Sequence, residues 1–112
     1  RPTLMEFDGV VEPASEEEIP HTCALADLSG LYCCPHTGVA LASLKKLLQK
    51  GIIDPRARVV VISTAHGLKF SQFKIDYHRQ QLEGVSAQYA NLPLEIPATI
   101  DAVQAAIKSH HP

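Results

Sequence analysis

Hydrophobic and polar positions follow two different periods along this chain. The run 59–62 is apolar, β-branched and uninterrupted, which is typical of a strand buried on both faces. Shorter apolar runs at 9–11 and 31–34 are further candidate strands. In 39–50, apolar residues recur at spacings of three and four opposite lysines and glutamines, which indicates an amphipathic helix. This alternation predicts an α/β fold class: part of a parallel open sheet with helices on its faces.

Two end signals refine the helices of the first half. Ser15 with Glu18 three residues later matches a capping box, so a helix should begin there and end near 29–30. Pro20 removes one backbone donor after the first turn of that helix, so the helix begins either loosely or near Pro20 itself. Gly51 is suited to end the helix over 39–50.

The second half is less regular. Phe73 and Tyr77 are spaced i,i+4 and predict a helix over 70–82. The stretch 84–98 contains one glycine and two prolines and is interpreted as an irregular excursion. A terminal helix is predicted over 99–111.

Composition excludes several functional classes. The 112 residues carry a formal charge of −2 and no basic stripe, so we expect no nucleic-acid partner. No apolar run approaches the roughly 20 residues that span a bilayer, so we expect no membrane partner. Three cysteines, two of them adjacent, do not make a disulfide framework and indicate an intracellular, reducing compartment. We expect residues 1–112 to be a single segment of a longer protein, because the chain begins abruptly without methionine.

Two turns at predicted strand ends, 34–38 and 63–67, contain the candidate chemistry. Adjacent parallel strands would bring both turns to one edge of the sheet, where ligands bind in open α/β folds. The first turn opens a helix, whose free backbone donors favour an anion or a polarised carbonyl. Gly38 and Gly67 would let the backbone approach a ligand closely. The simpler alternative is two ordinary loops in which hydroxyls cap the backbone.

The same turns contain residues that could bind a metal ion or act as a thiol nucleophile. Cys34 and His36, joined through folding by Cys33, His66 or His78, could offer metal ligands, yet no zinc-type spacing is present, so we expect no metal site. Nucleophilic catalysis by Cys33 or Cys34 is a weaker hypothesis, because only a nearby helix start would lower the thiol pKa.

Three stretches resemble the C-terminal part of threonine synthases of the longer, plant-type branch. They read Cys-Pro-His-Thr-Gly-Val-Ala-Leu at 34–41, Ser-Thr-Ala-His-Gly-Leu-Lys-Phe at 63–70 and Lys-Ile-Asp-Tyr-His at 74–78. Weaker likeness at 9–12 and 15–18 extends the resemblance over most of the chain, from about Phe7 to Ile107. The resemblance implies a C-terminal piece of the fold-type-II pyridoxal-phosphate enzyme fold.

The same resemblance implies a carbon–oxygen lyase that converts O-phosphohomoserine and water to L-threonine and phosphate with pyridoxal 5′-phosphate. It gives Thr64 the contact with the pyridine nitrogen, and a neutral hydroxyl there would leave the ring less electron-poor than a carboxylate would. The resemblance implies that the cofactor-binding residues are Ser63, Thr64, Thr37 and Gly38. It implies that the substrate-pocket residues are His36, His66 and Gly67. Related enzymes have Glu-Pro where this chain has Cys34-Pro35, so we expect no acidic contribution from this turn.

The resemblance also implies what lies elsewhere. The Schiff-base lysine and the Gly-rich phosphate loop of the family belong to its N-terminal part, so we expect no catalytic residue here and no activity of this segment alone. The expected partners are the rest of the enzyme chain and, through exposed apolar surface, a second copy in a homodimer. Plant-type likeness indicates the plastid stroma, and another source would indicate the cytoplasm. Two alternatives stay open: a threonine or serine ammonia-lyase of the same fold, and a non-catalytic module derived from it.

Overall fold

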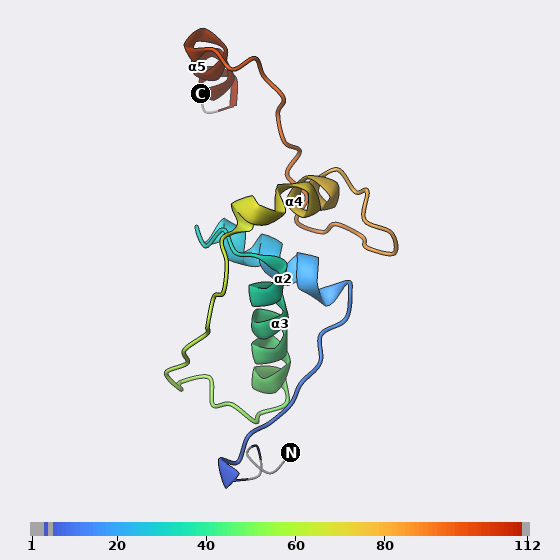
Figure 1. Ribbon diagram of the computed structural model, residues 1–112, viewed down its shortest axis with the longest axis vertical. Helices are drawn as coiled ribbons and strands as arrows, with labels where there is room; N and C mark the ends of the chain where they lie inside the picture. Colours follow the sequence, from blue (N-terminus) through green and yellow to red (C-terminus); the bar gives the residue numbers. More distant parts are fainter. Residues whose placement is uncertain (1–3, 5, 111–112) are drawn as a thin grey trace.

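The computed structural model describes residue 4 and residues 6–110, in which helices dominate (Figure 1). The elements are α2 (Glu18–Leu28), α3 (Pro35–Gln49), the 3₁₀ turn η1 (Gly67–Phe70), α4 (Ser71–His78) and α5 (Ile100–His110). Between residues 7 and 110 no strand is formed, and Cys33 and His66 make one isolated antiparallel bridge. The predicted parallel sheet is therefore not seen among the described residues, and the α/β fold class stays a prediction.

The start of α2 is fixed by the predicted capping box. The Ser15 backbone N–H donates to the Glu18 carboxylate over 2.8 Å, and the Glu18 N–H donates to Ser15 Oγ over 3.2 Å. The helix itself begins at Glu18, so Pro20 lies in its first turn, where a backbone N–H has no partner within the helix. Pro20 is buried there.

The crossing of α2 and α3 forms the centre of the molecule (Figure 1). α3 begins with Pro35, whose missing N–H costs nothing in a first turn, and Gly51 follows its end with a positive φ of 68°. Gly38 lies at the crossing, where a Cβ would overlap Cys23 Sγ and lie 3.1 Å from the Ile19 carbonyl oxygen. Gly38 therefore allows the two helices to approach, which is a packing role.

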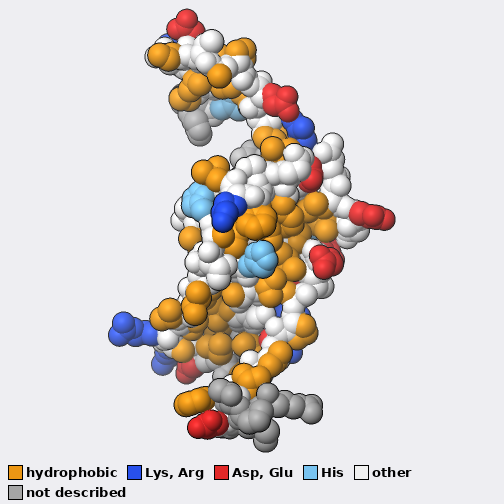
Figure 2. Space-filling view, viewed as in Figure 1, with side chains coloured by type: hydrophobic (Ala, Val, Ile, Leu, Met, Phe, Trp, Pro, Cys, Tyr) orange, Lys and Arg blue, Asp and Glu red, His pale blue; other side chains and the backbone are white. Residues whose placement is uncertain are grey.

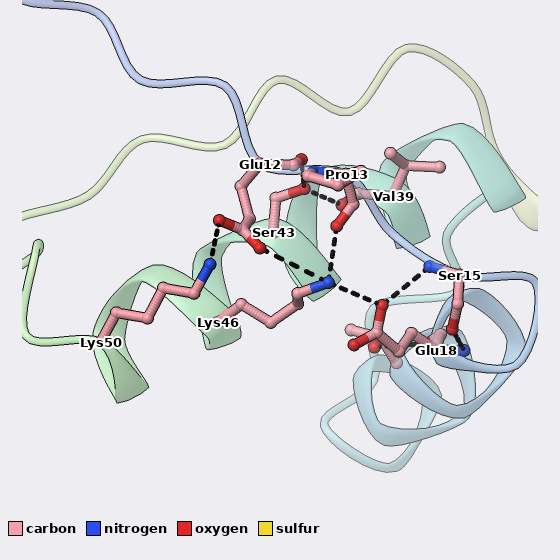
Figure 3. Close-up of polar contacts among 9 residues, drawn as sticks. Glu12, Pro13, Ser15, Glu18, Val39, Ser43, Lys46 and Lys50 are labelled. Atoms are coloured by element: carbon pink, nitrogen blue, oxygen red, sulfur yellow. Dashed lines mark hydrogen bonds and ion pairs between the residues drawn. The ribbon is translucent and has the colours of Figure 1, made fainter.

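A polar network attaches the segment before α2 to α3 (Figure 3). Lys46 Nζ lies 3.0 Å from the Glu18 carboxylate and donates to the Pro13 carbonyl over 2.7 Å. Lys50 Nζ lies 2.6 Å from the Glu12 carboxylate, and this hydrogen bond lowers the pKa of Glu12. Residues 12–18 thus follow the side of α3, and the strand predicted at 9–11 is not formed.

The apolar run at 59–62 has no strand beside it. Val60 is 90% exposed and Ile62 is 78% exposed, and together with α3 they border an open groove of about 380 Å³. Hydrophobic side chains are spread over the visible face of the molecule (Figure 2). The radius of gyration is 17.4 Å, whereas a compact chain of this length has about 13 Å. These properties suit a segment that packs against further protein.

The second half departs from its predicted boundaries in one place. The helix predicted over 70–82 begins as η1 and ends at His78, because Gln80 has a left-handed backbone (φ 58°) and its N–H bonds to Tyr77. The excursion 84–98 contains no helix or strand and is held to α4 where the Tyr89 N–H donates to Tyr77 Oη over 3.2 Å.

α5 stands apart from the other helices (Figure 1) and buries none of its described residues. It follows the excursion and occupies most of the range predicted for a terminal helix, 99–111, whose last residue lies outside the described part. In the described part of the chain, no helix combines the length and apolar character that crossing a membrane requires.

Candidate functional site

The two polar turns lie side by side. The Gly67 N–H donates to the Tyr32 carbonyl over 2.9 Å, and the antiparallel bridge joins Cys33 to His66. Parallel strands were expected to bring the turns together, whereas one antiparallel contact does so here. The pairing sets the 63–66 segment against the start of α3.

Four small polar side chains from the two turns are in contact. Thr37 Oγ1 lies 3.3 Å from Cys34 Sγ and 3.1 Å from Ser63 Oγ, and Cys34 Sγ lies 3.8 Å from Thr64 Oγ1. Cys34 and Thr37 are buried, while Ser63 and Thr64 are exposed. The cluster therefore joins two exposed residues, Ser63 and Thr64, to the buried Cys34 and Thr37.

The thiol of Cys34 differs from the other two. Burial raises its pKa, but hydrogen bonds from the Thr37 side chain and backbone, from Thr64 and from His36 outweigh that effect and bring the pKa down to about 6. Burial instead raises the pKa of Cys23 to about 12 and also raises that of Cys33. The expectation that only a helix start would lower a thiol pKa here was wrong, because the hydroxyls of both turns do so.

The two glycines of the site are packed against protein. Gly67 lies on the ring of Tyr32, where a Cβ would be 2.7 Å from Cδ1 and 3.0 Å from the Cys33 carbonyl oxygen. Gly38 faces α2, as described above. Both glycines are buried, so close approach to a neighbouring element accounts for them without a ligand.

The two histidines predicted for the substrate pocket, His36 and His66, are both exposed. His66 Nδ1 accepts a hydrogen bond from the Leu68 N–H over 3.2 Å, so a neutral His66 carries its proton on Nε2. The ring of His36 lies 5.6 Å from that of Phe70, edge to face. Within the described residues, no three histidine, cysteine, aspartate or glutamate side chains gather as a metal site.

A buried ion pair beside the turns was missed at the level of sequence. Lys74 Nζ lies 2.8 Å and 2.6 Å from the two carboxylate oxygens of Asp27, and 4.7 Å from the centre of the Tyr32 ring. The Lys74 side chain is only 5% exposed. The apolar neighbours of Lys74, Phe73 and Ile75, are a weak sequence signal for burial of this lysine. The signal is not specific, because Lys69 also lies between two apolar residues.

Comparison with known proteins identifies the relatives of this chain. No protein-family model matches it. Threonine synthase 2, chloroplastic, of Arabidopsis thaliana is 46% identical over 107 residues, which cover 96% of this chain and 21% of that protein. The threonine synthase of Methanosarcina acetivorans is 32% identical over 105 residues, or 93% of this chain and 23% of that protein. That of Methanocaldococcus jannaschii is 44% identical over 62 residues, or 54% of this chain and 15% of that protein.

The chain thus spans about a fifth of the length of the curated relatives it matches. The similarity to the Arabidopsis protein runs through nearly the whole chain and includes both polar turns. Over that length, the chain is a homologue of one segment of the threonine synthases.

Proposed function

We propose that this chain is the C-terminal segment of a threonine synthase, a lyase that converts O-phosphohomoserine and water to L-threonine and phosphate. The observation that carries the proposal is the 46% identity over 96% of the chain. The name of that relative, chloroplastic, also supports a plastid location. The remaining four-fifths of such an enzyme would be the first partner of the segment.

The cofactor of the proposed reaction is pyridoxal 5′-phosphate, which when bound supplies an electron sink for the substrate carbanion. The residues present fit one side of it. Ser63 and Thr64 are exposed hydroxyl residues on a backbone held by the Cys33–His66 bridge. A single hydroxyl would suit the contact with a pyridine nitrogen, and the proposal assigns that contact to Thr64.

His66 and His36 are proposed to face the substrate. Because Nδ1 of His66 is engaged by the Leu68 N–H, its Nε2–H is the group free to donate to a phosphate oxygen. The proposal assigns Thr37 to the support of the hydroxyl edge, since it is buried beside Ser63.

The segment is proposed to be inactive alone. A family lysine bound to the cofactor and a phosphate-binding loop would come from the rest of the enzyme. Lys74 is paired with Asp27 and buried, with its Nζ over the ring of Tyr32. This geometry supports a structural role for Lys74.

Product analysis of the complete enzyme that contains this segment tests the proposal. We expect threonine and inorganic phosphate to form from O-phosphohomoserine. A keto acid and ammonia from threonine, with no threonine from O-phosphohomoserine, would instead identify an ammonia-lyase. No product from either substrate would favour the non-catalytic module.

Replacing Thr64 with valine in the complete enzyme should reduce turnover about tenfold and shift the cofactor absorption band, because one hydrogen bond worth about 0.5–1.5 kcal/mol is lost while the shape is nearly kept. Steady-state rates and absorption spectra measure both effects. Thr22→Val is the matched control, since the Thr22 hydroxyl donates to the Glu18 carbonyl within α2. Equal rates and spectra for wild type and Thr64→Val would exclude Thr64 as the pyridine contact.

A further inference from the structure

Tyr32 supports the turn at His66 through its backbone. The Gly67 N–H donates to the Tyr32 carbonyl over 2.9 Å, and the next residue, Cys33, forms the antiparallel bridge to His66. Two successive residues before α3 therefore hold two successive residues of the second polar turn.

The Tyr32 side chain contacts the same turn. A Cβ on Gly67 would be 2.7 Å from Cδ1 and 2.9 Å from Cε1 of the ring, so no larger residue fits between the ring and the turn. The centre of the Tyr32 ring is 5.6 Å from that of His66, at an interplanar angle of 48°. This separation is typical of a packed aromatic pair. The ring of Tyr32 therefore supports the imidazole, and its carbonyl supports the backbone.

The ring of Tyr32 is itself held by a buried charge. Lys74 Nζ on α4 is 4.7 Å from the centre of the ring, which is within the usual range of a cation–π contact. Lys74 is buried and donates to both carboxylate oxygens of Asp27 on α2. One continuous series of contacts thus runs from Asp27 through Lys74 and Tyr32 to His66.

His66 is an exposed side chain, and such side chains change rotamer within nanoseconds. A group that binds a ligand in one geometry is instead held by packing and by hydrogen bonds from its neighbours. His66 has both, because the Leu68 N–H donates to its Nδ1 and the Tyr32 ring packs beside it. The ring is therefore oriented, and the proton of the neutral imidazole is on Nε2.

We propose, building on the function proposed above, that Tyr32 is a positioning residue for the substrate phosphate. Its ring holds the His66 imidazole in the orientation in which Nε2–H donates to a phosphate oxygen. Tyr32 acts through His66 and does not touch the substrate in this role. The phosphate contact is made in the ground state and in the transition state alike, so losing it changes KM and leaves kcat nearly unchanged.

Tyr32→Leu in the complete enzyme removes the ring and keeps an apolar side chain and the backbone carbonyl. We expect KM for O-phosphohomoserine to rise about tenfold, as for the loss of one hydrogen bond to a charged group, with kcat within about twofold of wild type. Tyr32→Phe keeps the ring and should restore the wild-type KM. Tyr89→Leu is the matched control, because Tyr89 pairs with a different histidine, His21, at 6.2 Å between ring centres.

A second background shows whether Tyr32 acts through His66. His66→Asn keeps a polar side chain that can cap η1, and it removes the Nε2–H donor. This change alone should raise KM about tenfold, and adding Tyr32→Leu should raise it no further, because the two residues act as a unit. A ring that only supports the fold would raise KM by the same factor in both backgrounds, which would overturn the proposal.

Inorganic phosphate, a product of the proposed reaction, gives a readout without turnover. Phosphate is titrated into the complete enzyme loaded with its cofactor, and nitrogen-15 NMR of labelled histidine follows the His66 Nε2 resonance, assigned by its absence in His66→Asn. The resonance should shift on binding, and Tyr32→Leu should require about tenfold more phosphate for the same shift. A His66 resonance that phosphate does not move would overturn the proposal.

The outcomes separate the two proposals. In an enzyme that makes threonine, an unchanged KM in Tyr32→Leu, with an unchanged circular dichroism spectrum, overturns the role of Tyr32 alone. If Tyr32→Leu does not fold, Tyr32→Met replaces it with the same expected rise in KM, because methionine fills irregular gaps without a ring. An unchanged KM in His66→Asn overturns the assignment of His66 and with it that of Tyr32. An enzyme that makes no threonine from O-phosphohomoserine overturns the proposed function, whatever the phosphate titration shows.

Discussion

Replacing Lys74 with methionine is expected to lower the local opening free energy of the α2–α4 contact by about 3–5 kcal/mol, because removing one partner of a buried ion pair leaves the other charge uncompensated. Lys74 Nζ contacts both carboxylate oxygens of Asp27, whose side chain is 15% exposed. Hydrogen exchange of α2 and α4 amides in the complete enzyme measures the loss, since amides that exchange through local opening report its free energy.

The double variant Asp27→Leu with Lys74→Met is the control for this prediction. Replacing both members of a buried pair by apolar side chains of similar volume is often neutral, so the double variant should recover most of the protection. Unchanged protection in Lys74→Met would show that the pair contributes nothing to this contact. If the double variant is as poorly protected from exchange as the single variant, the lost protection comes from the cation–π contact between Lys74 and Tyr32.

Replacing Gly38 with alanine is expected to separate α2 from α3 and to cost about 1–3 kcal/mol of local stability, the usual range for overpacking a filled core. The added methyl would overlap Cys23 Sγ and press on the Ile19 carbonyl oxygen. In an isolated helix, alanine is more favourable than glycine by about 1 kcal/mol. A loss of local stability would therefore indicate crowding between α2 and α3, and a gain would indicate that helix propensity dominates. Hydrogen exchange of the α2 amides gives that sign.

Cys23→Ala, combined with Gly38→Ala, tests whether contact with the Cys23 sulfur causes the expected loss of stability. It removes the sulfur that the new methyl would meet, so the double variant should be more stable than Gly38→Ala by a measurable coupling energy. Strict additivity of the two changes would mean that the methyl is accommodated elsewhere. A stabilised Gly38→Ala single variant would mean that the two helices can move apart without loss.

Helix ends were predictable from the sequence because they depend on neighbours a few positions away. Ser15 and Glu18 form the predicted capping box, and α3 ends just before Gly51 with the expected positive φ. The 70–82 prediction overran α4, since nothing in the polar sequence after His78 signals the left-handed backbone at Gln80. Local sequence rules thus predicted which segments are helical better than they predicted where each helix ends.

Long-range contacts were predictable only in part. The polar turns were expected to meet, and they do so around Cys34 and Thr37, but through an antiparallel bridge. Lys74 and Asp27 are 47 positions apart, and no local pattern selects one lysine among six for burial. The state of the Cys34 thiol likewise depends on Thr64, 30 positions away.

The exposed run before the polar turn affects how this chain behaves when produced alone. Residues 59–64 form a six-residue window of β-branched and hydroxyl side chains without charge, proline or glycine, and Val60 and Ile62 are largely exposed. Such windows stack readily into cross-β aggregates. Arg56 and Arg58 precede the window as gatekeeper charges, but the other end is unprotected. We therefore expect the segment produced alone to aggregate unless further protein covers this window.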